Sequence, residues 1–293
     1  MFQQTDGWPL RTSILVLFFL CLLSPSSAAG DDGASEFGWS TSGRVSFIGA
    51  RGNSDSTTAG LELALTRTWQ AAELKIAGGA LVAESNTKDR RAIGSVDAFE
   101  ILELEEDNKA AEEFSASIDF TRQHSGIFLW LTGVSWEKNE AAGFFHRYQA
   151  RFGLGYAARD EGEQCMKLAL SLTWTDEDPL VEDGQTDDSF PGLRFNHTYG
   201  RPLTQTSRYE SHWTLDSNFD ALDDFRFDWS QTLTVSINKW LALELEARWR
   251  YDHQPALEAV PLLDLEDGPS GQTVNVGLEE NDTQLTLALV FHR

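Results

Sequence analysis

Apolar and charged side chains alternate along residues 241–252, which read Leu-Ala-Leu-Glu-Leu-Glu-Ala-Arg-Trp-Arg-Tyr-Asp. The odd-numbered positions are all apolar or aromatic, and the even-numbered ones carry charge at Glu244, Glu246, Arg248 and Arg250. Because successive side chains of a β-strand point to opposite faces, this pattern predicts a strand with one apolar and one charged face. A helix would leave no apolar stripe, since the charges would lie on opposing sides of it.

The same alternation recurs along most of the chain, and it predicts an all-β protein of about twelve strands. The alternating segments are residues 43–52, 57–69, 72–84, 114–121, 126–137, 144–158, 166–174, 190–199, 209–219, 225–238, 241–252 and 284–291.

The connections between these segments are long and acidic after the third, seventh and eleventh segments, at residues 85–113, 175–189 and 253–282. In a closed meander, successive connections alternate between the two rims, so all three would lie at the same rim. Bacterial outer-membrane barrels have this asymmetry, with short turns on one side and longer loops on the other. The sequence therefore predicts a closed, antiparallel, up-and-down β-barrel.

Three features favour a barrel with its apolar face toward lipid. The segments are about 9–14 residues long, similar to the tilted span of a bilayer. Aromatic residues lie near the segment ends, where interfacial girdles form, at Trp136, Trp174, Trp240, Tyr251 and Phe291. The charges of residues 244–250 would then face the lumen and pair there with opposite charges. A secreted soluble β-protein with a solvated charged face is the alternative reading.

The first 29 residues predict a cleaved export signal, with an apolar core at residues 14–23 and small residues at 26–29. Residues 30–42 are expected to form a flexible lead-in, and residues 43–293 the barrel. Removal of the signal takes Cys21 with it and leaves Cys165 without an internal disulfide partner. We interpret Cys165 as a small barrel-wall residue. The expected location is the bacterial outer membrane.

The composition is strongly acidic, with 23 Lys and Arg against 46 Asp and Glu and a formal net charge of −23. Such a field repels phosphates, so nucleic-acid binding is not expected.

Both ends of the predicted barrel resemble a known family. Near the start, residues 42–46 (Ser-Gly-Arg-Val-Ser) lead to a turn made by Gly52, Asn53, Ser54 and Asp55. Near the end are residues 250–255 (Arg-Tyr-Asp-His-Gln-Pro) and 281–286 (Asn-Asp-Thr-Gln-Leu-Thr). Together these motifs resemble the salt-induced outer-membrane protein family. The resemblance implies a Gram-negative outer-membrane β-barrel without an established activity, a link to osmotic stress, and contact with lipid, lipopolysaccharide and the barrel-insertion machinery.

Catalytic chemistry is not expected. The six histidines are scattered over different segments, and Ser211 and His212 would point to opposite faces of one strand. The sequence contains no Gly-x-Ser-x-Gly elbow and no His/Cys spacing typical of zinc. We therefore expect a structural protein or a narrow passive pore without a cofactor, and a lipid-modifying outer-membrane enzyme is the alternative.

The acidic connections are candidates for weak binding of divalent cations, which prefer carboxylate oxygens and bridge lipopolysaccharide phosphates. Their spacing is not that of a calcium loop, so a solvated charged surface is the simpler interpretation. The three clusters are Glu103, Glu105, Glu106 and Asp107; Asp176, Glu177, Asp178, Glu182, Asp183, Asp187 and Asp188; and Asp264, Glu266 and Asp267.

Overall fold

The computed structural model describes residues 38–51, 55–95, 98–159, 165–181, 188–264 and 268–292. These residues form fourteen strands and one short 3-10 helix, η1 (Glu140–Ala142). The strands are β1 (Gly38–Arg51), β2 (Asp55–Trp69), β3 (Ala72–Ser95), β4 (Ala98–Ser125), β5 (Phe128–Asn139), β6 (Phe144–Arg159), β7 (Cys165–Pro179), β8 (Ser189–Pro202), β9 (Ser207–Asn218), β10 (Phe225–Asn238), β11 (Leu241–Asp252), β12 (Leu257–Asp264), β13 (Gly268–Gly277) and β14 (Asn281–His292).

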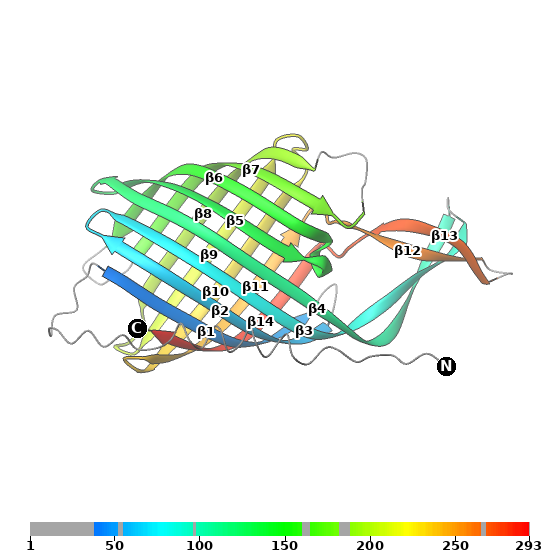
Figure 1. Ribbon diagram of the computed structural model, residues 1–293, viewed down its shortest axis with the longest axis horizontal. Coiled ribbons are helices and arrows are strands. Elements are labelled where there is room, and N and C mark those ends of the chain that lie inside the picture. Colours follow the sequence, from blue (N-terminus) through cyan, green and yellow to red (C-terminus); the bar gives the residue numbers. More distant parts are fainter. Residues whose placement is uncertain are drawn as a thin grey trace, which may run out of the picture. The chain divides into compact units, whose positions relative to one another are not determined.

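Twelve of the strands, β1 to β11 and β14, form a closed antiparallel barrel (Figure 1). Each strand from β1 to β11 pairs with the next along the chain, and β14 closes the ring by pairing with both β11 and β1. The predicted fold class, an up-and-down barrel of about twelve strands, is confirmed.

The two rims of the barrel differ in their connections. One rim, here called the short rim, has links of two to five residues, at 70–71, 126–127, 160–164, 203–206 and 239–240. The opposite, long rim has the links at 140–143, 180–188 and 219–224, and also the segments after β3 and β11. The three long connections therefore lie at one rim, as the sequence predicts.

Two of the predicted long loops are in fact strands. β3 and β4 remain paired from Ala72↔Arg122 to Ser95↔Ala98, far beyond the point where their barrel neighbours β2 and β5 end. The second loop contains the hairpin of β12 and β13, and β12 pairs in parallel with β3 at Leu262↔Ala92. We call this four-stranded sheet the rim extension; Figure 1 shows β12 and β13 beside the continuation of β3 and β4.

The rim extension has a small apolar core of its own. Ala92, Val260, Leu262 and Val274 are buried there. Ile101 and Val276 pack against this cluster.

The barrel wall separates apolar from polar side chains. On β11 the side chain of Leu245 is 45% exposed, and its neighbours on the outer face, Leu243 and Trp249, are also exposed. Exposed aromatic side chains lie near strand ends, among them Trp174, Trp240 and Phe291. Small polar residues such as Ser46 and Ser171 are buried on the inner face. This arrangement reverses that of a soluble β-barrel, in which the interior is apolar.

β1 begins at Gly38, so the last five residues of the predicted lead-in, 38–42, belong to the first strand. The first two of these pair with Thr68 and Arg67 of β2. The predicted signal peptide and the rest of the lead-in lie outside the described residues. Across the described ranges, no helix is long and apolar enough to cross a membrane.

Candidate functional site

Ion pairs line the inner face of the barrel. In the first group of them, Arg44 on β1 pairs with three carboxylates. Arg44 lies 2.8 Å from Glu62 on β2, 2.9 Å from Glu244 and 3.1 Å from Glu246, the last two on β11. We call these four residues the Arg44 cluster. A guanidinium group presents five N–H donors in a planar fork, so one arginine can serve several carboxylates.

The predicted lumen charges of β11 are thus divided between two partners. Glu244 and Glu246 pair with Arg44, whereas Arg248 and Arg250 both pair with Asp228 on β10. The Nε of Arg248 is 2.8 Å from Asp228 Oδ1, and the Nε of Arg250 is 3.7 Å from Asp228 Oδ2. Neither was predicted as an ion-pair partner, although Arg44 belongs to the family-like motif at residues 42–46 and Asp228 occupies a polar position of an alternating segment.

A second network lies toward the long rim. Glu177 near the end of β7 accepts from Arg147 on β6 at 2.6 Å and from Arg226 on β10 at 3.4 Å. Arg226 also lies 3.3 Å from Asp252 and 4.0 Å from Asp224. Every one of these pairs joins different strands or a strand and a connection, so the network holds the wall together at this level.

Arg194 and Asp216 form a two-pronged pair between β8 and β9. The Nε and Nη2 atoms of Arg194 each donate to a different carboxylate oxygen of Asp216, both at 2.7 Å. Arg151 on β6 pairs through one nitrogen, Nη2, with Asp119 on β4 across β5, where Gly133 leaves room for the two side chains.

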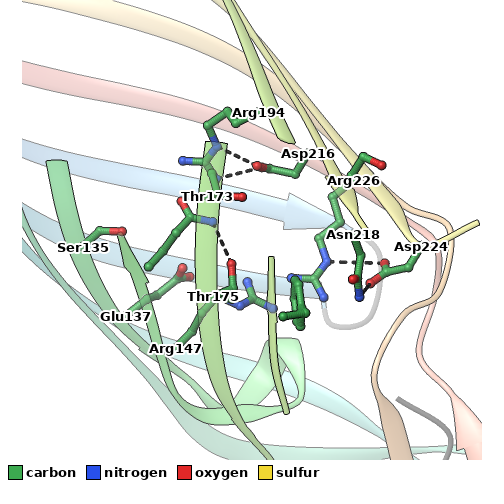
Figure 2. A pocket seen from close by; sticks show the side chains of 13 residues that line it. Ser135, Glu137, Arg147, Thr173, Thr175, Arg194, Asp216, Asn218, Asp224 and Arg226 are labelled. Carbon is green, nitrogen blue, oxygen red and sulfur yellow. Dashed lines mark hydrogen bonds and ion pairs between the residues drawn. The ribbon is translucent and has the colours of Figure 1, made fainter. Parts of the chain in front are cut away.

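A cavity of about 200 Å³, which we call the rim cavity, is lined by members of these ion pairs, among them Arg147, Arg194 and Arg226. Figure 2 shows that its arginines come from three strands, with Arg147 on β6, Arg194 on β8 and Arg226 on β10. Its lining residues are Ser135, Glu137, Arg147, Gln149, Thr173, Thr175, Phe190, Arg194, Asp216, Ser217, Asn218, Asp224 and Arg226. All lie toward the strand ends at the long rim or in the adjoining link.

The link between β9 and β10 contributes to the wall of the rim cavity. Asn218 is 3% exposed and Asp224 is 7% exposed, and the amide of Asn218 donates to Asp224 Oδ2 at 3.0 Å. The backbone N–H of Phe219 donates to the carbonyl of Pro191 at 3.0 Å, which ties the link to β8. A second cavity, also about 200 Å³, lies beside the Arg44 cluster and is lined by Glu113, Arg248 and Gln284 among others.

The other residues singled out from the sequence are placed as follows. The turn residues Gly52, Asn53 and Ser54 lie outside the described residues, and Asp55 is the first residue of β2. Ser211 and His212 lie on opposite faces: Ser211 Oγ accepts from the indole of Trp229 at 3.3 Å, while Nδ1 of His212 is 2.9 Å from Thr198 Oγ1. Cys165, interpreted above as a barrel-wall residue, lies on β7, and its Sγ atom accepts a hydrogen bond from Arg208 on β9 at 3.4 Å.

The acidic clusters are not all in loops. Residues 103–107 belong to β4, and residues 176–178 to β7, where Glu177 is an ion-pair partner. Asp188 precedes β8 and Asp264 ends β12, whereas the members between 182 and 187 and at 266–267 lie outside the described residues. In the part of the chain that the structure describes, no group of three or more His, Cys, Asp or Glu side chains is arranged to hold a metal ion.

The sequence pattern of the family described as "Protein of unknown function, DUF481" matches residues 43–292. The chain belongs to this family. The DUF481 match covers the rim extension and all of the barrel except the first five residues of β1, which is nearly the same range as the resemblance seen in the sequence. No curated protein matches the chain.

Solved structures similar to this DUF481 chain include an outer membrane channel from Pseudomonas putida F1, with 10% identity and a TM-score of 0.50 over 90% of this chain and 100% of that chain. The NanC porin has 7% identity and a TM-score of 0.48, covering 85% and 98%. An anion-selective porin from Comamonas acidovorans has 11% identity and a TM-score of 0.40, covering 87% and 98%. At such low identity the likeness to the Pseudomonas putida channel shows the fold alone.

Proposed function

We propose that this protein is a barrel of the bacterial outer membrane whose interior is a narrow passive conduit for small polar solutes. The observation that carries the proposal is that the inner face of the barrel is lined by ion pairs whereas its outer face is apolar and exposed. The inner face suits water and polar solutes, and the outer face suits lipid.

The outer face supports the membrane location. Barrel strands of 12–16 residues such as β5, β6 and β11 are long enough to cross a bilayer at a tilt. The aromatic side chains near their ends suit the level of the lipid headgroups. Outer-membrane lipid and lipopolysaccharide are therefore its proposed surroundings, and the barrel-insertion machinery its proposed partner during assembly.

The inner face supports a narrow passage rather than a wide one. Ser46 is 0% exposed, and Ser171 and Thr286 are also almost completely covered although they face the interior. Long, ion-paired side chains such as Arg44 and Arg248 extend from the same inner face and take up part of the lumen. Barrels of moderate strand number have interiors that side chains can largely fill.

A link to osmotic or salt stress rests on the sequence resemblance alone. It predicts that the amount of the protein in the cell envelope rises when cells are moved to high salt. Quantitative immunoblotting of envelope fractions before and after the shift tests this, and an unchanged level would remove the link without affecting the conduit.

The conduit is tested by single-channel recording of the purified, folded protein in planar bilayers. Small discrete conductance steps are expected. Arg248→Ala should enlarge them because it removes a long side chain from the lumen, whereas Leu243→Ala on the outer face should leave them unchanged. A folded, inserted protein with no conductance would refute the conduit.

The membrane location has a separate test. Cell fractionation should recover the protein with the outer membrane, and the unheated sample should migrate differently from the boiled one in a denaturing gel. Recovery in the soluble fraction without such a shift would contradict the location.

A further inference from the structure

The rim cavity is lined by as many arginines as carboxylates, although the protein as a whole is strongly acidic. Its lining includes three arginines and three carboxylates, Arg147, Arg194 and Arg226 against Glu137, Asp216 and Asp224. Two further carboxylates outside the lining pair with these arginines, Glu177 with Arg147 and Asp252 with Arg226. An anionic ligand would approach three arginines whose charge is already offset by five carboxylates, so it would gain little attraction and meet repulsion.

Direct binding of a cation to Asp216 or Glu177 is disfavoured for a related reason. Asp216 is held by two hydrogen bonds from Arg194, and Glu177 is shared by Arg147 and Arg226. To bind these carboxylates directly, a cation would have to displace a guanidinium group from a partly buried ion pair. Removing one partner of such a pair is costly, because the other charge is left without compensation.

The lining also includes uncharged residues with hydrogen-bonding groups, which are Ser135, Gln149, Thr173, Thr175, Ser217 and Asn218. The amide of Asn218 is already engaged by Asp224 and by the backbone N–H of Asp220. Gln149 donates to the hydroxyl of Thr175 at 3.2 Å, so the two groups form one polar surface between β6 and β7. Hydroxyls both donate and accept, as do amides through their separate N–H and C=O groups. A ligand with several hydroxyl groups would match this mixture.

Phe190 supplies an apolar surface within this polar lining. Binding sites for small molecules commonly combine an apolar or aromatic surface with a few placed polar groups that fix orientation. The cavity volume of about 200 Å³ is many times the roughly 10–15 Å³ that one water molecule requires on this measure, so a compact solute fits.

We propose that the rim cavity is a binding site for an uncharged polyhydroxy solute of about monosaccharide size. The site lies at the long rim, where a solute entering from that side would meet it first. The inference builds on the proposed conduit, since it names the class of solute that would pass, but binding to the folded protein does not require conduction.

The experiment is calorimetric titration of the folded protein in detergent with glucose, glucuronate and glucosamine, which present similar rings without charge, with a negative charge and with a positive charge. Saturable binding of glucose is expected, with weaker binding of both charged sugars. Gln149→Leu and Phe190→Ala should each weaken glucose binding by about fivefold to tenfold, through loss of a hydrogen bond or of apolar contact. Gln284→Leu makes the same chemical change beside the Arg44 cluster and should leave binding unchanged.

The outcomes separate the two proposals. Absence of glucose binding to protein whose gel shift shows it to be folded would overturn the inference, as would tighter binding of glucuronate or glucosamine, or equal weakening by Gln284→Leu. Glucose binding without conductance in bilayers would retain the binding site and refute the conduit. Conductance that glucose does not reduce, together with no calorimetric binding, would retain the conduit and overturn the binding site.

Discussion

Arg44 on β1 reaches past β14 to place its Nη2 atom 3.1 Å from Glu246 on β11. The two strands are not neighbours, because β14 lies between them and closes the barrel. The same guanidinium group also pairs with Glu244 and with Glu62 on the other side. One side chain therefore spans four strands at the point where the first and last strands of the barrel meet.

Replacing Arg44 with Met should destabilise the barrel, because three carboxylates would lose their common cation. Breaking a partly buried pair from one side costs on the order of 3 kcal/mol. Urea unfolding in lipid vesicles, followed by tryptophan fluorescence, measures the change. Glu62→Gln is the matched control, since the side chain of Glu62 is 47% exposed and its loss should cost well under half as much. Equal effects would show that the Arg44 cluster does not hold the closure.

The two faces of β11 predict opposite responses to substitution. Leu245→Arg should hinder assembly, because an arginine on the lipid-facing side near the bilayer midplane costs about 2–4 kcal/mol. Glu246→Gln, one position along on the inner face, should be tolerated because Arg44 keeps Glu62 and Glu244 as partners. The folded fraction after refolding into vesicles, read from the heat-dependent gel shift, compares them. Equal tolerance of both changes would mean that the apolar face does not meet lipid.

The sequence predicts the wall of the barrel well because a closed barrel with a polar inner face and an apolar outer face imposes a strict alternation on each strand. β11 has the bounds that its own pattern predicts, residues 241–252. The rim extension was missed because its strands lie outside the barrel wall and bury only a few apolar side chains, so they lack a continuous apolar face. Residues 85–113 are rich in charge, and their apolar contribution to the core of the rim extension is limited to Ala92 and Ile101.

The partners on the inner face could not be predicted for a different reason. Alternation tells which face a side chain occupies but not the register between strands. Arg44 faces Glu62 directly, yet its contact with Glu246 depends on the stagger of β1, β14 and β11. The rim cavity likewise combines Arg147, Arg194 and Arg226, which belong to strands that are separated in sequence by other strands.

A glycine on the inner face should be sensitive to the smallest substitution. A Cβ at Gly153 on β6 would lie 2.5 Å from the carbonyl oxygen of Leu170 and 2.8 Å from Cα of Ser171, both backbone atoms of β7. Gly153→Ala should therefore lower the free energy of unfolding by about 1–3 kcal/mol through overpacking. Gly78→Ala on β3 is the control, because its Cβ would find only Ser115 O at an ordinary 3.5 Å. Urea unfolding in vesicles should show a lower free energy of unfolding for Gly153→Ala and no change for Gly78→Ala.

The rim extension should unfold without the barrel. Val260 on β12 is 1% exposed and faces Val274 on β13, so Val260→Asp would bury a charge without a partner in the small apolar core. Thr273→Asp adds the same charge at an exposed position of β13 and serves as the control. Limited proteolysis should cleave the Val260→Asp variant within residues 253–282 much faster, while the heat-dependent gel shift of the barrel persists in both variants. Loss of that shift in Val260→Asp would mean that the extension and the barrel fold as one unit, because the twelve barrel strands then require the pairing of β12 with β3 to form.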